Sequence, residues 1–315
     1  MSLEKKGAEV LAAMDTKLQS DGGDNRMIAL REILVPIDFS SHCALVAKYA
    51  AAAARHFHSK LTFLHVLRPM DSTRVTSAMN TDEFLAKEKE DCCKHMSLFL
   101  KKEVPCVDFQ CLATEGDPSE VIENYVESQH VGLVMMPTRG CGAFRRFLLG
   151  SVAGKVLHDV DCPVWTSSHL MNGNPTASIT PKVIVCPIDF SSRTNSVLKW
   201  ASDLASEYQA RLIVVHAIQS LKYQPETYYL EAEMRKALMD DARNKILKML
   251  QDCATAEYEV RIEAGDVTTV VHSVVEDSGA DRLVIGRTSG EEALGRLRTH
   301  SYALIRESTC PVISL

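Results

Sequence analysis

Short apolar runs alternate along the chain with longer segments in which apolar residues recur every three or four positions. The short runs, such as ILVPI and LVMM, contain no polar residue, which is typical of strands buried on both faces of a parallel sheet. The longer segments have the period of amphipathic helices. Strands and helices that alternate in this way predict βαβ units with right-handed crossovers, and therefore an α/β fold.

In the first half of the chain this pattern predicts five strands and four helices. The strands are expected near residues 32–38, 60–67, 107–113, 132–137 and 162–167. The helices are expected near residues 42–57, 81–102, 118–129 and 150–159. The second half repeats the pattern from Lys182, and its second helix is expected near residues 226–252.

The second half also repeats the landmarks of the first half in the same order. The phrase ILVPIDFS at residues 33–40 returns as IVCPIDFS at residues 184–191, an offset of 151 residues that His65 and His216 share. A Gly-Asp pair and a closing Cys-Pro-Val follow, the latter at an offset of 148 residues. A repeat of this length is a whole domain rather than a solenoid unit.

The repeat divides the chain into four parts. We expect an N-terminal appendage at residues 1–28, domain one at residues 29–167, a linker at residues 168–181 and domain two at residues 182–315. The appendage should contain a short helix around residues 8–18, and the linker is rich in Asn, Pro, Ser and Thr. Each domain should contain a Rossmann-like parallel sheet of five strands in the order 3-2-1-4-5, with helices on both faces.

Composition and charge exclude several classes of protein. Of the 315 residues, 35 are Lys or Arg and 41 are Asp or Glu, and no basic block is long enough to neutralise a nucleic-acid backbone. No apolar run approaches the roughly 20 residues of a membrane-spanning helix, and the charged N-terminus differs from a signal peptide. The ten cysteines include no Cys-x-x-Cys pair. We therefore expect a cytoplasmic protein that binds neither nucleic acid nor membrane, with buried thiols and no metal site.

Candidate binding residues follow the fourth predicted strand of domain one. Gly140 and Gly142 follow this strand, and Gly150 and Ser151 open the next helix. The unpaired N–H groups and the positive dipole end of that helix would favour a phosphate, so we call Gly140, Gly150 and Ser151 the phosphate cradle. Taken alone, these residues also fit a simpler interpretation, in which the glycines turn the chain and Ser151 is an ordinary N-cap.

Asp38 lies across the same predicted crevice, because strands one and four are neighbours in the order 3-2-1-4-5. A carboxylate that accepts ribose hydroxyls beside a phosphate cradle suits a nucleotide. The alternative is that Asp38 caps the helix near residues 42–57, although Ser40 or Ser41 could do so instead.

Together these motifs resemble the universal stress protein family, once in each half of the chain. In domain one the matching motifs are Pro36-Ile37-Asp38-Phe39-Ser40, Leu64-His65-Val66, Gly116-Asp117, Gly140-x9-Gly150-Ser151-Val152 and Cys162-Pro163-Val164. The resemblance implies the adenine nucleotide α-hydrolase-like form of the Rossmann-like fold. One branch of the family binds ATP through a Gly-x-x-Gly-x9-Gly-Ser/Thr motif.

The resemblance also implies a set of binding residues for ATP, with or without Mg²⁺, in domain one. Pro36, Ile37 and Asp38 would contact the base and the ribose, and Val66 would offer backbone groups to adenine. The residues around the base side and the phosphates would be Met136, Gly140, Gly150, Ser151 and Val152.

Two departures from the family motif matter. The first motif glycine is Pro137 in domain one, which removes a backbone donor. Aligning the two Cys-Pro-Val landmarks places Arg298 and Thr299 of domain two where domain one has Gly150 and Ser151. We therefore predict that only domain one binds a triphosphate, although Arg298 could instead pair with a phosphate itself.

Signatures of common enzymes are missing: the chain contains no P-loop, no Gly-x-Ser-x-Gly elbow and no His-Glu-x-x-His. His65 and His216 end buried strands and are expected to be structural. Arg139, Arg145 and Arg146 lie in the loop between the fourth strand and Gly150, which we call the cradle loop, where they are either solvated or hold a γ-phosphate. The leading hypothesis is a stress-response regulator that binds ATP and signals through shape or partner binding. The alternatives are a slow ATPase and a nucleotide-free assembly module.

The last strands of the two domains also carry a prediction about assembly. They begin at the Cys-Pro-Val landmarks and are expected to be edge strands, whose unpaired backbone groups invite pairing. Family members commonly pair through these strands as dimers. The resemblance therefore implies that the two halves of this chain pair with each other about a pseudo-twofold axis, with a homodimer through another surface as an option.

Overall fold

The computed structural model of the chain describes residues 28–67, 81–105, 107–138, 149–167, 179–218, 228–287 and 299–315. The helix expected at residues 8–18 lies outside these ranges, as does most of the expected linker. Gly140 and the neighbouring arginines of the cradle loop also lie outside the described residues, and so does Arg298.

The strands follow the order that the sequence pattern predicts. Those of domain one are β1 (Glu32–Pro36), β2 (Lys60–Leu67), β3 (Gln110–Glu115), β4 (Leu133–Pro137) and β5 (Val164–Ser167). Those of domain two are β6 (Val183–Pro187), β7 (Arg211–Ile218), β8 (Tyr258–Ala264), β9 (Arg282–Ile285) and β10 (Val312–Ser314).

The helices alternate with these strands. Those of domain one are α2 (Ser41–Phe57), α3 (Thr81–Glu103), α4 (Pro118–Gln129) and α5 (Ser151–Asp159). Those of domain two are α6 (Thr194–Tyr208), α7 (Tyr228–Cys253), α8 (Val267–Ser278) and α9 (Thr299–Glu307).

Strand β3 begins three residues later than the sequence pattern predicts. It pairs with β2 only from Gln110, which lies opposite Thr62. Phe109, just before the strand, packs edge-on against the ring of Phe63 with 5.3 Å between the ring centroids. The apolar character of this stretch therefore reflects packing against the core rather than membership of the sheet.

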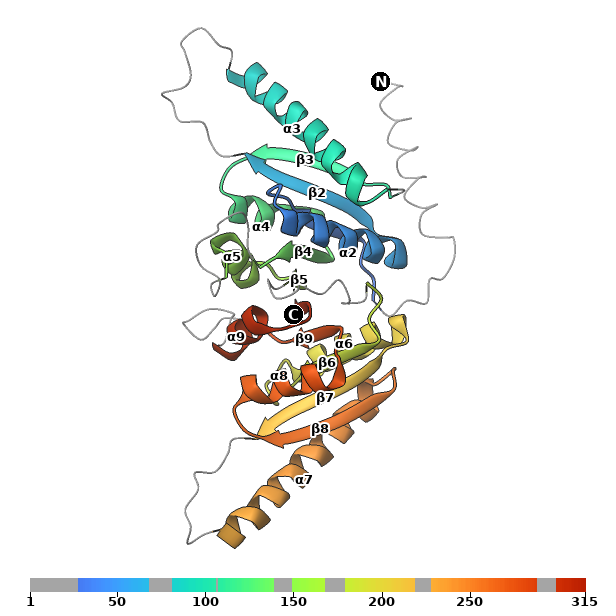
Figure 1. The fold of residues 1–315 in the computed structure, drawn as a ribbon, viewed down its shortest axis with the longest axis vertical. Coiled ribbons are helices and arrows are strands. Elements are labelled where there is room, and N and C mark those ends of the chain that lie inside the picture. The colour runs from blue at the N-terminus through green and yellow to red at the C-terminus, as the bar shows by residue number, and fades with distance from the viewer. Residues whose placement is uncertain are drawn as a thin grey trace, which may run out of the picture.

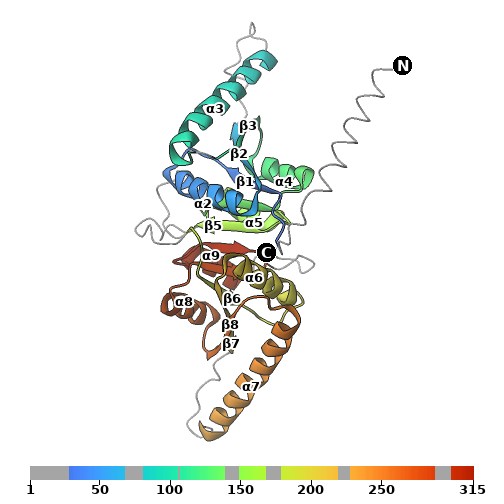
Figure 2. The same cartoon turned by 90° about the vertical axis from the view of Figure 1, so that its right-hand side faces the viewer.

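The described strands form one ten-stranded sheet that runs through both domains. Its order is β3-β2-β1-β4-β5-β10-β9-β6-β7-β8 (Figure 1). Neighbouring strands within each domain are parallel, and β5 and β10 are antiparallel. The two domains therefore continue one sheet, with their last strands side by side at its centre (Figure 2).

Helices cover both faces of this sheet and bury a hydrophobic core on each. One core includes Val46 of α2, Met96 of α3, Leu198 of α6 and Ile246 of α7. The other core lies under α4, α5, α8 and α9. Each core contains residues of both domains, because the antiparallel pairing of β5 and β10 places equivalent helices on the same face. The apolar faces of the helices thus stabilise each domain and also the junction between the domains, where β5 pairs with β10.

The junction is closely packed between the two domains. Trp165 of β5 lies opposite Ile313 of β10, and both side chains are buried. On either side of this pair a hydroxyl donates across the junction, from Thr166 to the Val312 carbonyl and from Ser314 to the Val164 carbonyl, each at 3.3 Å. The two hydrogen bonds are reciprocal, because Thr166 and Ser314 hold equivalent positions after the two Cys-Pro-Val landmarks, as do Val164 and Val312.

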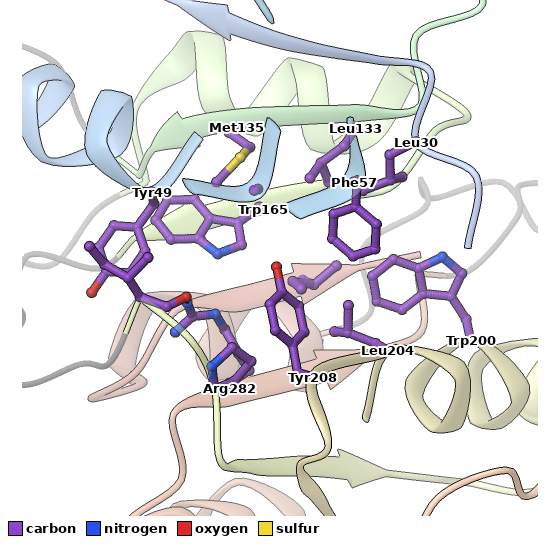
Figure 3. A pocket seen from close by; sticks show the side chains of 14 residues that line it. Leu30, Tyr49, Phe57, Leu133, Met135, Trp165, Trp200, Leu204, Tyr208 and Arg282 are labelled. Atoms are coloured by element: carbon purple, nitrogen blue, oxygen red, sulfur yellow. The ribbon is translucent and has the colours of Figure 1, made fainter. Parts of the chain in front are cut away.

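A cavity of about 40 Å³ lies beside the junction, between α2 and α6. Side chains from both domains converge on it, among them Tyr49, Trp165, Trp200 and Tyr208 (Figure 3). The guanidinium of the buried Arg282 lies 5.1 Å from the centre of the Tyr49 ring, and burial lowers the pKa of this arginine. Large rings of both domains and one cation thus contact one another beside the junction, an arrangement that stabilises it.

Candidate functional site

Asp38 follows β1 at the carboxyl end of the sheet, with its side chain exposed. The chain leaves β1 through Ile37, whose N–H donates to the Leu64 carbonyl of β2 at 2.8 Å. One carboxylate oxygen of Asp38, Oδ1, accepts the N–H of Ser40 at 3.0 Å and the thiol of Cys43 at 2.9 Å. The carboxylate is therefore held in a defined orientation at the edge of the sheet.

The cap of helix α2 is Ser40 and not Asp38. The hydroxyl of Ser40 accepts the N–H of Cys43 at 3.4 Å, and its backbone is extended, as is usual for an N-cap. Ser40 therefore has the capping role, and the hydrogen bonds from Ser40 and Cys43 orient the Asp38 carboxylate.

The thiol of Cys43 is a site feature that the sequence pattern does not reveal. Cys43 lies in an apolar stretch and is 1% exposed, so by sequence alone it counts as a small core residue. Burial raises its pKa to about 12, which keeps the thiol protonated. It can therefore donate to the Asp38 carboxylate at neutral pH.

Phe39 lies in the turn that presents Asp38, and His65 of β2 contacts this turn. Phe39 has a φ of 60°, a left-handed conformation that is strained for a bulky residue. Its ring contacts that of His65, with 4.8 Å between the centroids. His65 Nδ1 lies 2.7 Å from the Ile37 carbonyl, so its N–H can hold the chain just before Asp38. The histidine of this motif is thus structural, as the sequence predicts.

The start of helix α5 lies next to the carboxyl end of β4, at the same edge of the sheet as Asp38. Its N-cap is Gly150, whose N–H donates to the Thr138 carbonyl at 2.8 Å. Gly150 has no side chain to cap the helix, and Ser151 beside it is exposed. The first N–H groups of an α-helix have no acceptor within the helix, so this end can receive an anion.

The pairing of β1 with β4 brings these two features to one edge of the sheet. Ile33 and Leu34 lie opposite Leu133 and Val134, so both strands end at the same level. The other predicted site residues flank this edge: Pro36 ends β1, the half-buried Val66 lies near the end of β2, the buried Met136 lies near the end of β4, and the half-buried Val152 lies in the first turn of α5.

The Gly116-Asp117 motif of domain one shapes the start of α4. Gly116 has a φ of 149°, in the region that favours glycine. Asp117 Oδ1 accepts the N–H groups of Ser119 and Glu120 at 3.0 and 3.3 Å. The hydrogen bond from the Ser119 hydroxyl and those from the backbone lower the pKa of Asp117. The motif thus has a capping role in this fold.

Domain two repeats the turn around the aspartate. Asp189 Oδ1 accepts the N–H of Ser191 at 3.0 Å and the hydroxyl of Thr194 at 3.4 Å. Thr194 thus takes the place of Cys43. His216 Nδ1 again lies 2.9 Å from the carbonyl before the aspartate, that of Ile188. The aspartate side of the candidate site is therefore present in both domains.

Just after the fourth strand, on the phosphate side of the candidate site, the described residues differ between the two domains. Arg287 occupies the position of Thr138, because Arg282 pairs with Ile184 as Leu133 pairs with Ile33. Its side chain is buried and does not line the edge of its own domain.

The described ranges contain neither a cluster of metal ligands nor a helix able to cross a membrane. No group of three or more His, Cys, Asp or Glu side chains there is placed to hold a metal ion. The helices there include none with the length and hydropathy needed to cross a membrane.

Comparisons with known proteins agree with this architecture. A family model for the universal stress protein family matches residues 29–167 and again residues 181–314. A universal stress protein from Methanocaldococcus jannaschii is 26% identical over 137 residues, which are 42% of this chain and 79% of that protein. One from Thermus aquaticus is 29% identical over 135 residues, which are 42% of this chain and 96% of that protein.

Solved structures match the chain over both domains. The crystal structure of a universal stress protein from Archaeoglobus fulgidus has a TM-score of 0.62 at 18% identity and covers 90% of this chain and 98% of that one. A functionally unknown protein from Pseudomonas aeruginosa has a TM-score of 0.63 at 17% identity, over 91% of this chain and 92% of that one. The chain belongs to the universal stress protein family and carries one family domain in each half.

Proposed function

We propose that domain one binds an adenine nucleotide, ATP in particular, and that its occupancy regulates the shape or the partner affinity of the protein in a stress response. Domain two would bind no triphosphate and would act as a structural or interaction half. Pro36, Ile37, Asp38, Val66, Met136, Gly140, Gly150, Ser151 and Val152 are the proposed binding residues. Any Mg²⁺ would arrive with the phosphates.

The proposal rests on the placement of Asp38 and the start of α5 at one edge of the sheet. Asp38 and the N-terminal end of α5 lie at the carboxyl ends of two paired strands, where open α/β sheets place their ligands. The carboxylate, oriented by Ser40 and Cys43, suits ribose hydroxyls. The helix end suits a phosphate. A nucleoside phosphate carries both groups.

Replacing Asp38 with alanine tests the ribose contact. We expect Asp38→Ala to weaken ATP binding by about 1–3 kcal/mol, the scale of a charge-assisted hydrogen bond, without unfolding the protein. Calorimetry on the full chain measures the change. Asp189→Ala, in the same turn of domain two, is the matched control and should leave the affinity unchanged. Equal losses from the two substitutions would contradict the assignment.

The nature of the ligand and its fate are tested on the wild-type protein. Mass spectrometry of the small molecules released from the purified protein should identify an adenine nucleotide. Protein that neither retains nor binds one in calorimetry would support the nucleotide-free assembly module instead. Phosphate release measured on the same samples separates regulatory binding from a slow ATPase.

Cys43 offers a second test, because its thiol orients Asp38. We expect Cys43→Val to raise the dissociation constant for ATP about fivefold, since the valine has a similar size but cannot donate to the carboxylate. Cys43→Thr copies Thr194, which donates to Asp189 in domain two, and should retain near wild-type affinity. Calorimetry on the two variants distinguishes orientation from mere packing. Similar losses in both variants would show that only the volume of the side chain matters.

We also propose that the pairing of β5 with β10 within one chain replaces the homodimer that single-domain family members form. Residues 168–181 would act as the linker that permits this arrangement, and residues 1–28 as an appendage. The cytoplasm is the proposed location. The hydroxyl contacts across the junction and its two shared cores support the intramolecular arrangement.

A further inference from the structure

Domain two contacts both ends of helix α5, the helix that opens the phosphate side of the candidate site. At the N-terminal end, the backbone N–H of Leu149 donates to the hydroxyl of Tyr302 on α9 at 3.2 Å. At the C-terminal end, the guanidinium of Arg287 donates to the carbonyls of Leu157 and Cys162 at 2.9 and 2.5 Å. Helix α5 is thus held at both ends by side chains of the other domain.

The contact from Tyr302 acts next to the proposed phosphate position. Leu149 directly precedes Gly150, whose own N–H donates to the Thr138 carbonyl at 2.8 Å. Two consecutive amides are therefore anchored, one to domain two and one to the end of β4. The position of the next N–H groups, which face an anion at a helix start, depends on both anchors.

Arg287 fixes the opposite end of the same helix. Its side chain is 3% exposed, and its hydrogen bond to the Leu157 carbonyl is to one of the last carbonyls of α5, which have no partner within the helix, while its bond to Cys162 is to the chain just after the helix. Its positive charge also interacts favourably with the negative end of the helix dipole. Rotation or sliding of α5 would break these bonds, so Arg287 restrains the whole helix.

These contacts run in one direction. The residue of domain one equivalent to Tyr302 is Gly154, at the offset of 148 residues, and glycine has no hydroxyl to return the contact. The residue equivalent to Arg287 is Thr138, whose hydroxyl donates at 2.9 Å to Ser167 of its own domain. Domain two therefore supplies the supporting side chains, and domain one contains the supported helix.

We propose that Tyr302 and Arg287 are positioning residues for the nucleotide site of domain one, through which domain two sets the nucleotide affinity. This inference rests on the proposed function. It gives domain two a role at the site that requires no ligand of its own. A partner that displaced α9 from Leu149 would thereby lower nucleotide affinity in the other domain.

Tyr302→Phe tests the contact, because it removes the acceptor and keeps the ring. Hydrogen exchange of the ligand-free full chain is the first measurement, and the Leu149 amide should exchange about fivefold faster, as expected for one lost hydrogen bond. Calorimetry is the second, and the dissociation constant for ATP should rise about fivefold with an unchanged stoichiometry. Tyr258→Phe, at the far edge of domain two, is the matched control and should change neither quantity.

The two measurements separate this inference from the proposed function. Faster exchange at Leu149 with unchanged ATP affinity would overturn the positioning role, and so would unchanged exchange. If the wild-type protein bound no ATP at all, the proposed function would fail, whereas the exchange result would still report on the support of α5. Arg287→Thr, which copies Thr138, should also raise the dissociation constant for ATP. If it fails to fold, Tyr302→Phe still decides the matter.

Discussion

Replacing Gly150 with arginine should abolish ATP binding. The change copies Arg298 of domain two and places a long side chain at the N-cap of α5, where the proposed phosphate lies. Gly150 has a φ of −62° and a ψ of 148°, which any residue can adopt, so the fold should tolerate the arginine. We expect the dissociation constant to rise by at least about 100-fold, or about 3 kcal/mol. Calorimetry should show one ATP per chain in the wild type and none in Gly150→Arg.

A second glycine of the same helix supplies the control. A Cβ at Gly154 would lie 3.6 Å from the Leu149 side chain, an ordinary contact. Gly154→Ala should therefore bind ATP like the wild type and should be more stable by about 0.5–1 kcal/mol, because alanine favours the helix. Two equivalent ATP sites per chain would contradict the assignment of binding to domain one. Tighter binding by Gly150→Arg would show instead that an arginine at this position pairs with phosphate.

Removing domain two should turn domain one into a homodimer. Without β10, the backbone edge of β5 and the buried Trp165 become accessible, and such an edge pairs readily. A fragment of residues 28–167 should fold, since one copy of the universal stress protein family model matches residues 29–167. Sedimentation should report a dimer of the fragment. The same fragment with Trp165→Glu should remain a monomer, because the dimer would bury its charge.

The packing at the junction sharpens this prediction. In the full chain one indole faces one isoleucine, Trp165 opposite Ile313. A homodimer about the same axis would place two indoles in that layer and would overfill it. A fragment of residues 179–315 should therefore displace the homodimer and form a mixed pair. A domain-one fragment that stayed monomeric, or full-length protein with two separated lobes in small-angle scattering, would contradict this arrangement.

Much of the fold could be predicted because local pattern and burial agree along most of the chain. The apolar run of β1 and the periodic stripe of α2 each follow from their own residues. The prediction began β3 three residues early, since Phe109 is half-buried by its contact with Phe63 and takes no part in strand pairing. A sequence shows that a residue is apolar, but it does not show which surface buries it.

The candidate site was predictable only in part. The Asp-Phe-Ser phrase and Gly150-Ser151 identify groups whose chemistry depends on their own side chains or on a helix start, so sequence is enough to find them. The thiol of Cys43 has no such signal, because a cysteine in an apolar helix resembles any core residue. Only its place five residues after Asp38 on a folded turn gives it the carboxylate as a partner.

The sequence by itself determined that this protein has two α/β domains of one family, that an aspartate follows the first strand of each, and that only domain one has glycine and serine at the start of its last helix. The tertiary structure alone decided that Cys43 orients Asp38 and that Tyr302 and Arg287 hold helix α5 from the other domain. The physical reason is that repeats and helix caps are local in the chain. The bond between Cys43 and Asp38 requires the folded turn between β1 and α2, and the bonds of Tyr302 and Arg287, between residues more than a hundred positions apart, depend on how the two domains join at β5 and β10.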